Sequence, residues 1–474
     1  MASNRKSSNG TEHDDWLGDL LVGAVGLAGI GLWRFALRWP DLAAVIAVTV
    51  VTAALADLRW ACVVGGLAAV LVWGWRLGWP DSYQDCVGRP VADYRRAYLV
   101  YRRRWRTICE HHGLSISPRG DRGADPVLPT LREVRIGACV DILVVRLLVG
   151  QSAKTWESTA DGLAAAFGAH TVVITAGPVD AGRGRDIVVR VRHHDALVAP
   201  IPLPRPRPDT RPTLAPVAVG VTEDATPWKL PVTGRHILIG GATGAGKGSV
   251  MWSLVAGLGP AIRSGFVVVR CIDPKGGMEF GAAAPLFERF AHDQDHILSV
   301  LRDTAATMLA RANRLRGTTR QHRPSRAEPH IVVLIDELAT LTAYVTDRKQ
   351  RNEVDQLLGL LLSQGRAVGV CVIAAVQDPS KDVISLRQLF PIRVGLRMTE
   401  STQTAMILSS AAHHQGARCE DIPDHTPGVG YVLTEGTTTV ARVRAYLVTD
   451  ADINYLTTHF TPLPRPHGDP AGQK

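Results

Sequence analysis

The chain has 474 residues, which is enough for two or three domains that each bury a hydrophobic core. Its 53 Lys and Arg residues against 44 Asp and Glu residues give a formal net charge of +9. This balance favours a polyanionic partner such as DNA or an anionic membrane surface, although an ordinary basic composition would give the same charge. The seven cysteines are scattered without a Cys-x-x-Cys pair, which excludes a disulfide framework and fits reduced thiols in the cytosol.

The first 80 residues combine a polar tail with an apolar segment. Residues 1–15 are polar and lack the apolar run of a secretory signal peptide. Residues 16–80 contain three apolar stretches, each somewhat short of the ~20 residues of a spanning helix and each flanked by Trp, as in an aromatic belt. We expect Leu42–Ala56 and Ala61–Trp75 to form a membrane hairpin, and Leu20–Trp33 to be a third span or an interfacial helix. A buried helical hairpin of a soluble domain is the alternative.

A basic juxtamembrane region, residues 81–127, follows and is expected to be helical. Its run Tyr94–Arg106 is rich in arginine and tyrosine. By the positive-inside rule, this run places the chain after Trp79 in the cytoplasm and predicts a multi-pass protein of the plasma membrane. The same run could bind lipid headgroups or DNA phosphates, and its position beside the membrane favours lipid.

Residues 128–200 are predicted to form a small α+β domain. Val134–Leu148 is rich in β-branched residues, as a strand would be, and Thr171–Thr175 and Asp186–Val191 are predicted as further strands. Ala153–Phe167 carries apolar residues at helical spacing and stops before a glycine. The segment shows no constellation of catalytic residue types.

Two proline-rich segments mark boundaries in the second half of the chain. Residues 201–216 are predicted to be a stiff, extended linker, and residues 461–474 a disordered tail. The segment between them, residues 217–460, carries the motifs described next and is predicted to be an ATPase domain.

A glycine-rich loop lies between a short apolar strand, His236–Gly240, and an amphipathic segment, Val250–Leu258. The loop has the G-x-x-x-x-G-K pattern of a P-loop in the strand-to-helix context that the motif needs. Its glycines let backbone N–H groups surround phosphates, and the start of the helix adds a favourable dipole. We expect ATP to be bound by Gly241, Ala242, Thr243, Gly244, Ala245, Gly246, Lys247, Gly248 and Ser249, with Lys247 reaching the β- and γ-phosphates.

The loop departs from the usual pattern at one position. The Ser or Thr that normally follows the lysine and ligates Mg²⁺ is Gly248 here, and a hydroxyl arrives one residue later, at Ser249. One residue corresponds to about 100° around a helix, so Ser249 cannot simply take over that role. Ser249 as a metal ligand, contact of Ser249 with the α-phosphate, and water in the metal shell remain alternatives.

A second apolar strand, His330–Ile335, ends in two acids. This is a Walker-B pattern, which predicts that Asp336 holds Mg²⁺ directly or through water and that Glu337 is the general base for the attacking water. The alternative is a helix N-cap, a role that Asp336 alone would fit.

A third strand, Gly369–Val376, ends in Gln377, which is predicted to sense the γ-phosphate or to orient water; a plain strand terminator is the alternative. Four predicted strands alternate with helical stretches along the chain: Ile237–Gly240, Phe266–Ile272, Ile331–Ile335 and Gly369–Val376. This alternation predicts an α/β fold with a parallel sheet and the nucleotide at the carboxyl ends of the strands.

Together these motifs resemble the FtsK/SpoIIIE translocases, and within that family the actinobacterial plasmid-transfer members. The resemblance covers Val217–Asp452 and rests on Gly241–Ser249, Ile272–Lys275, Leu334–Ala339, Gly365–Val370, Ala374–Ser380 and Phe390–Arg397. It implies a RecA-like P-loop ATPase that uses ATP and Mg²⁺. It also implies a membrane-anchored hexameric ring that pumps double-stranded DNA through a central pore, for DNA transfer or segregation.

The resemblance also implies that an arginine of a neighbouring subunit completes each catalytic site as a finger. Arg366, Arg393 and Arg397 are the candidates, and the choice among them stays open. Two other functions remain possible: a protein-export ATPase of the type VII secretion kind, which usually has several tandem ATPase domains, and a membrane scaffold that binds nucleotide without hydrolysing it. The Asp336-Glu337 pair argues against the scaffold.

Overall fold

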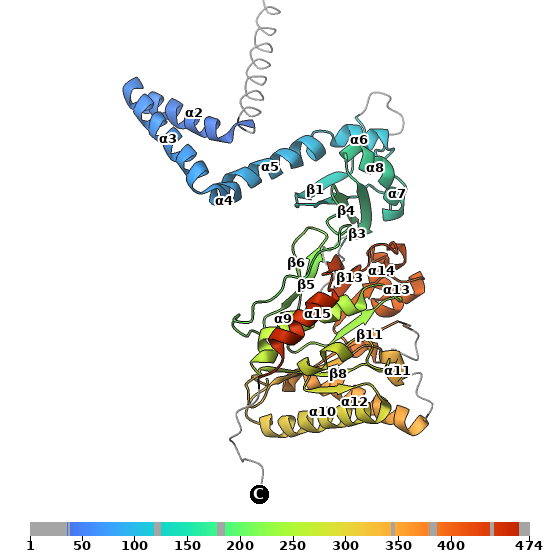
Figure 1. The fold of residues 1–474 in the computed structure, drawn as a ribbon. Coiled ribbons are helices and arrows are strands. Elements are labelled where there is room, and N and C mark those ends of the chain that lie inside the picture. Colours follow the sequence, from blue (N-terminus) through green and yellow to red (C-terminus); the bar gives the residue numbers. More distant parts are fainter. Residues whose placement is uncertain are drawn as a thin grey trace, which may run out of the picture. The chain divides into compact units, whose positions relative to one another are not determined.

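The structure is a computed structural model that divides into two compact units, residues 1–111 and 112–474, and each is described by itself (Figure 1). It describes residues 36, 38–117, 125–177, 185–342, 347–377, 379, 386–436 and 440–463.

The first unit is helical. Helices α2 (Pro40–Leu55) and α3 (Leu58–Gly78) pack against each other, and Arg76 Nη1 lies 2.7 Å from Asp41 Oδ2, which ties the end of α3 to the start of α2. The shorter helices α4 (Pro80–Tyr83), α5 (Arg89–Arg96) and α6 (Trp105–His111) follow, with π-helical turns between them. Large apolar side chains remain more than half exposed on both long helices, among them Val50, Val51, Leu55, Leu67, Val70 and Leu71.

The two long helices coincide with two of the predicted apolar stretches, and Leu20–Trp33 lies outside the described residues. Within the part of the chain that the structure describes, α3 is the one helix long and apolar enough to cross a membrane, by length and composition. It has 21 residues, whereas α2 has 16. The prediction of two or three membrane helices is therefore supported for one helix.

The second unit begins with a four-stranded antiparallel sheet in the order β1-β2-β4-β3. Its strands are β1 (Thr130–Arg135), β2 (Val140–Arg146), β3 (Thr171–Ala176) and β4 (Asp186–Arg192), and its helices are α7 (Ala153–Glu157) and α8 (Ala160–Phe167). The structure thus divides the predicted strand Val134–Leu148 between β1 and β2, and the predicted helix Ala153–Phe167 into two. Gly168 ends α8 in the left-handed conformation (φ +65°), which costs a glycine little.

The proline-rich segment 201–216 follows the surface of the larger sheet rather than standing clear of it. Leu203 N donates to Leu447 O (3.2 Å), and the Arg205 side chain pairs with Asp452 (2.8 Å). These contacts fix a segment that the sequence predicts to be a simple spacer.

A ten-stranded sheet in the order β6-β5-β14-β13-β12-β7-β11-β10-β8-β9 forms the centre of the ATPase domain. Neighbours from β12 to β9 are parallel, as predicted, whereas β12, β13, β14, β5 and β6 pair antiparallel. The sheet is therefore mixed, which corrects the prediction of a parallel sheet. Its strands are β5 (Val217–Thr222), β6 (Pro227–Leu230), β7 (Ile237–Gly240), β8 (Val267–Ile272), β9 (Arg289–Ala291), β10 (His330–Ile335), β11 (Val370–Val376), β12 (Ile392–Leu396), β13 (Val429–Thr434) and β14 (Ala441–Ala445).

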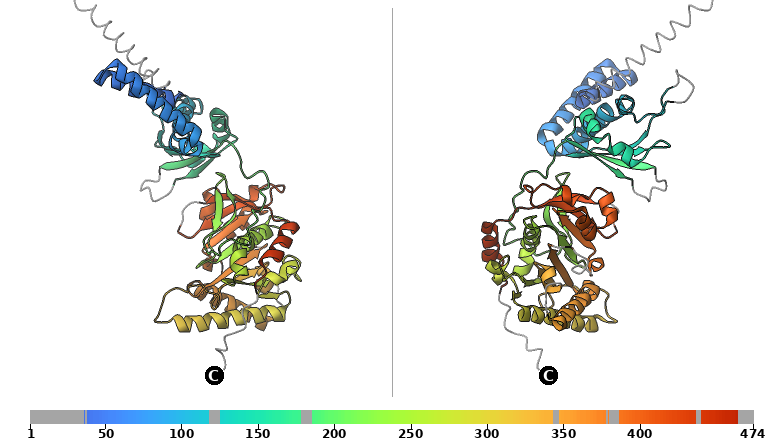
Figure 2. Two further views of the ribbon diagram at one scale, coloured as in Figure 1. Left: turned by 60° about the vertical axis from the view of Figure 1, so that its left-hand side comes forward. Right: turned by 90° about the vertical axis from the view of Figure 1, so that its right-hand side faces the viewer.

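Helices cover both faces of this sheet (Figures 1 and 2). Successive strand residues point to opposite faces, so Ile237 and Ile239 join the core beneath α9 (Lys247–Arg263) and α15 (Asp450–Phe460). Leu238 joins the core on the other face. That face is covered by α10 (Gln294–Leu315), α11 (Leu338–Thr342), α12 (Arg348–Gln364), α13 (Ser401–Ile407) and α14 (Ser410–His414). Because both faces are covered, the central strands are apolar throughout.

Candidate nucleotide-binding site

The glycine-rich loop joins the carboxyl end of β7 to the first turn of α9, as predicted. Gly244 and Gly246 have φ of +74° and +98°, a conformation that side chains with a Cβ rarely adopt. A Cβ at Gly246 would also lie 2.5 Å from Gly428 N. The turn therefore requires glycine at this position, and it leaves the start of α9 open to an anion.

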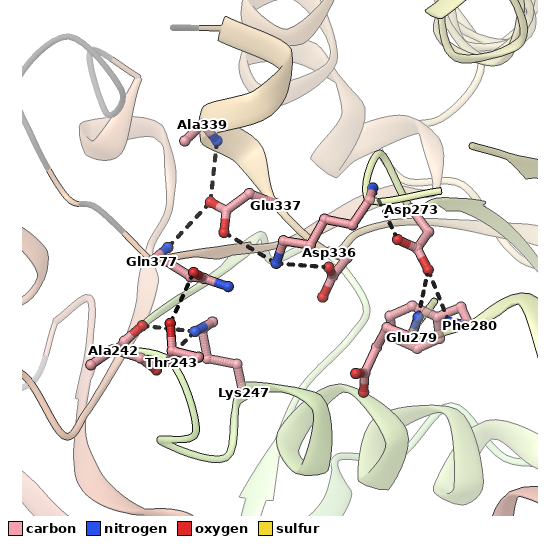
Figure 3. A network of polar contacts seen from close by, with 12 residues as sticks. Ala242, Thr243, Lys247, Asp273, Glu279, Phe280, Asp336, Glu337, Ala339 and Gln377 are labelled. Atoms are coloured by element: carbon pink, nitrogen blue, oxygen red, sulfur yellow. Dashed lines mark hydrogen bonds and ion pairs between the residues drawn. The ribbon is translucent and has the colours of Figure 1, made fainter. Parts of the chain in front are cut away.

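Lys247 is buried at the start of α9, with 7% of its surface exposed. Its Nζ donates hydrogen bonds to Gly241 O (2.8 Å) and Ala242 O (3.0 Å), so the ammonium group lies over the loop (Figure 3). Burial, with the charge of Lys275, lowers the pKa of Lys247 to about 8. Nearby carboxylates, Glu337 foremost, oppose this shift. The phosphates of a nucleotide would also favour the charged form.

The two acids at the end of β10 lie beside this loop, because β7, β11 and β10 are parallel neighbours whose carboxyl ends share one edge of the sheet. Asp336 and Glu337 are 6% and 4% exposed. Glu337 Oε1 accepts hydrogen bonds from Gln377 N (3.2 Å) and Ala339 N (3.4 Å), which fix the carboxylate (Figure 3). The three strand ends singled out in the sequence therefore meet.

Gln377 contacts the loop directly. Thr243 Oγ1 donates to Gln377 Oε1 (3.2 Å), so the side chain bridges the end of β11 and the P-loop. A pocket of about 370 Å³ opens at this place, lined by Ala242, Thr243, Lys275, Glu337, Ala339, Thr340, Gln377, Thr399 and Gln403. This position suits the predicted contact with a γ-phosphate or with an attacking water.

The turn after β8 supplies a second lysine, whose contact with the two acids was not predicted from the sequence. Lys275 Nζ lies 3.1 Å from Asp336 Oδ2 and 3.4 Å from Glu337 Oε2. Burial alone would lower the pKa of Lys275, but the two carboxylates outweigh burial and raise it above the usual lysine value.

Asp273 shapes that turn from inside. It is fully buried, and its Oδ2 accepts hydrogen bonds from Glu279 N (2.9 Å) and Phe280 N (3.0 Å), while Oδ1 accepts from Lys275 N (3.3 Å). Gly276 and Gly277 form the bend, with φ of +75° and +78°. One signal in the sequence could have found these residues: Asp273 follows a strand adjacent to β10 at the same edge.

The three candidate arginines lie in different places. Arg397 follows β12 and donates to Thr243 O (2.9 Å) while pairing with Asp424 (2.9 Å), so it contacts the P-loop of its own chain. Arg366 is 42% exposed and donates to Gly234 O (3.0 Å), ahead of β7 and thus at the opposite edge of the sheet. Arg393 lies within β12, and burial lowers its pKa.

The oxygen groups at the sheet edge fit Mg²⁺. This ion takes one or two carboxylates together with substrate phosphates and water, and Asp336 and Glu337 supply such carboxylates beside the phosphate-binding loop. Asp336 at the end of β10 would hold it. The predicted role of Ser249 stays a prediction.

The fold and these residues define a P-loop ATPase with Walker-A and Walker-B motifs. Residues 208–324 match the model of the FtsK/SpoIIIE family. The ATPase domain is of the FtsK/SpoIIIE type, as the sequence motifs predict.

Two sequence relatives and one solved structure are consistent with this assignment. The chain is 27% identical over 382 residues to the transfer protein TraSA of Streptomyces ambofaciens, covering 72% of this chain and 87% of the relative. It is 29% identical over 201 residues to the DNA translocase FtsK of Borreliella burgdorferi, covering 38% of this chain but only 24% of that relative. The conjugation coupling protein TcpA of pCW3, solved with ATPγS, shares the fold at a TM-score of 0.50 and 20% identity, covering 75% of this chain and 98% of that one.

Proposed function

We propose that this chain is a membrane-anchored ATPase that moves double-stranded DNA during DNA transfer between cells. The observation that carries the proposal is an FtsK/SpoIIIE-type site, with P-loop, Asp336 and Glu337 at one sheet edge, in a chain related to TraSA over most of its length. The net charge of +9 suits a DNA partner. Contacts to phosphates in a pore would be tolerant of sequence and sensitive to salt.

Each site residue has a place in the hydrolysis step. The P-loop backbone and Lys247 bind the triphosphate, and Gln377, held by Thr243, orients the attacking water at the γ-phosphorus. Glu337 accepts the proton of that water as the new P–O bond forms and the bond to ADP breaks. Mg²⁺ would neutralise charge on the β- and γ-phosphates.

The assembly we propose is a homo-hexameric ring anchored by α3. Exposed apolar side chains on α2 and α3 would face lipid, since they are unusual on a soluble surface. The arginine finger would come from the neighbouring subunit. Arg366 suits this role best, because 42% of its side chain is exposed and it lies away from the P-loop of its own chain.

The test uses the full-length protein in detergent micelles, with and without linear double-stranded DNA. We expect DNA to stimulate ATP hydrolysis, and we expect the protein to displace a third strand annealed to the duplex only when ATP is present. Glu337→Gln should still bind ATPγS but should lose both activities, because its amide accepts no proton.

The matched control is Glu353→Gln. Glu353 forms an exposed ion pair with Arg302 on the helical face of the domain, so its loss should change neither activity. Hydrolysis that ignores DNA in the wild-type protein would contradict DNA translocation. Binding of ATPγS without hydrolysis would identify a nucleotide-binding scaffold instead.

A further inference from the structure

Gly248 and Glu279 lie against each other at the start of α9. A Cβ at Gly248 would stand 2.2 Å from Glu279 Oε1 and 3.0 Å from its Cδ. A serine hydroxyl oxygen lies one bond beyond the Cβ. The carboxylate of Glu279 therefore occupies the space that the Ser or Thr side chain of an ordinary P-loop would fill.

The turn after β8 delivers Glu279 to this position. Asp273 Oδ2 accepts a hydrogen bond from Glu279 N, which fixes its backbone, and the Glu279 side chain runs from there toward α9 (Figure 3). Glu279 is an exposed residue. Partial desolvation of its carboxylate, and next the charge of Asp336, nevertheless raise its pKa, so the two acids are electrostatic neighbours.

The charged groups around the loop carry a net negative charge, which favours a divalent cation. Four carboxylates, those of Asp273, Glu279, Asp336 and Glu337, share the neighbourhood with the ammonium groups of Lys247 and Lys275. Lys275 balances part of the negative charge on Asp336 and Glu337, and a divalent cation would balance the remainder. Mg²⁺ takes carboxylate oxygens readily in place of a hydroxyl.

We propose that the Glu279 carboxylate replaces the missing P-loop hydroxyl as an oxygen ligand of the Mg²⁺ that accompanies ATP. Gly248 is then a necessary partner, because any side chain there would push the carboxylate away. The inference rests on the ATP-binding part of the proposed function and is independent of DNA translocation.

The test measures metal binding rather than activity. Full-length protein in detergent is loaded with ATPγS and titrated with Mn²⁺, and free Mn²⁺ is followed by electron paramagnetic resonance. We expect Glu279→Gln to weaken Mn²⁺ binding about 10- to 100-fold, as changes around metal ligands commonly do. Its affinity for ATPγS in excess EDTA and its melting temperature should match those of the wild type.

A swap of the two side chains separates ligation from packing. Gly248→Ser alone should weaken Mn²⁺ binding, because the new Cβ displaces the carboxylate. Combined with Glu279→Ala, Gly248→Ser should restore Mn²⁺ binding, since a hydroxyl can then fill the vacated space. Glu353→Gln is the control for removal of one carboxylate elsewhere.

Three outcomes would overturn the proposal. The first is that Glu279→Gln and Glu279→Ala both bind Mn²⁺ as the wild type does. The second is that the double variant binds no better than Glu279→Ala. The third is that the wild type binds no ATPγS, which would overturn the nucleotide site itself; loss of DNA stimulation alone would leave the metal result standing.

Discussion

The ammonium group of Lys275 lies 3.1 Å from Asp336 Oδ2 and 3.4 Å from Glu337 Oε2, so one lysine bridges the predicted metal ligand and the predicted general base. Both acids are almost fully buried, and buried carboxylates need a compensating charge. Lys275 supplies that charge at the place where a cation bound to Asp336 would compete with it.

Replacing Lys275 by methionine should therefore strengthen the binding of Mn²⁺ to the nucleotide-free protein. The affinity should rise by about tenfold for each 1.4 kcal/mol of repulsion between the lysine and the metal that is removed. Turnover should fall, because Glu337 loses a partner that positions it. Electron paramagnetic resonance of free Mn²⁺ and a steady-state ATPase assay measure the two effects. Lys229→Met, on the exposed side of β6, is the control. Unchanged or weaker Mn²⁺ binding in Lys275→Met would contradict competition between the lysine and the metal.

The pKa of Lys247, lowered to about 8 by burial and by Lys275, predicts a pH dependence of ATP binding. The side chain is charged below this pKa and neutral above it. Phosphates favour the charged form, so ATPγS binding should take up protons near pH 8 to 9, and affinity should fall by up to about tenfold per pH unit as pH rises above about 8.

Calorimetric titrations in two buffers of different ionisation enthalpy would measure this proton uptake. Lys247→Arg keeps the positive charge at every accessible pH, because the guanidinium group does not deprotonate. Its affinity, even if lower, should not fall over the same pH range. An equal decline in both proteins would assign the effect to another group.

The sequence was sufficient to bring Lys247, Asp336, Glu337 and Gln377 together. Each follows or ends an apolar strand, and carboxyl ends of parallel strands share an edge, so local patterns determine a long-range arrangement. Lys275 and Glu279 belong to an irregular turn whose course is set by hydrogen bonds to the Asp273 carboxylate. No periodicity encodes such contacts, and their role required the structure.

The antiparallel half of the sheet was missed for a related reason. In β14, Ala441–Ala445, arginines alternate with apolar residues, and such a short alternation is weak evidence for a strand. Its neighbours in space, β5 and β13, lie far from each other in the chain. The predicted helix Ala153–Phe167 was too long because Ser158 and Thr159 interrupt it, and such hydroxyl residues favour helix ends over helix interiors.

Arg366 should act between subunits. Arg366→Ala and Glu337→Gln should each abolish DNA-stimulated hydrolysis, yet a mixture should regain part of it. Some interfaces in the mixture join an intact Arg366 to an intact Glu337, and a finger contributes about 10³- to 10⁵-fold to turnover. The assay is the ATPase rate as a function of the mixing ratio of the two variants.

Arg397→Ala is the contrast. Arg397 contacts Thr243 of its own chain, so its replacement by alanine should weaken ATPγS binding. A mixture with no more activity than its components would exclude Arg366 as the finger.

Helix α3 should hold the protein in the membrane. Leu67 and Leu71 lie near the middle of its 21 residues and are 58% and 62% exposed, so lipid is their expected surrounding. Inserting a lysine at the centre of a spanning helix into the membrane costs about 2.5 to 3.5 kcal/mol. The double variant Leu67→Lys with Leu71→Lys should therefore be released from membranes that are washed with alkaline carbonate. The wild type should stay in the membrane pellet. Leu309→Lys is the matched control, because Leu309 is a 42% exposed leucine of α10 in the ATPase domain. If the double variant stays in the pellet as firmly as the wild type, α3 is not the anchor.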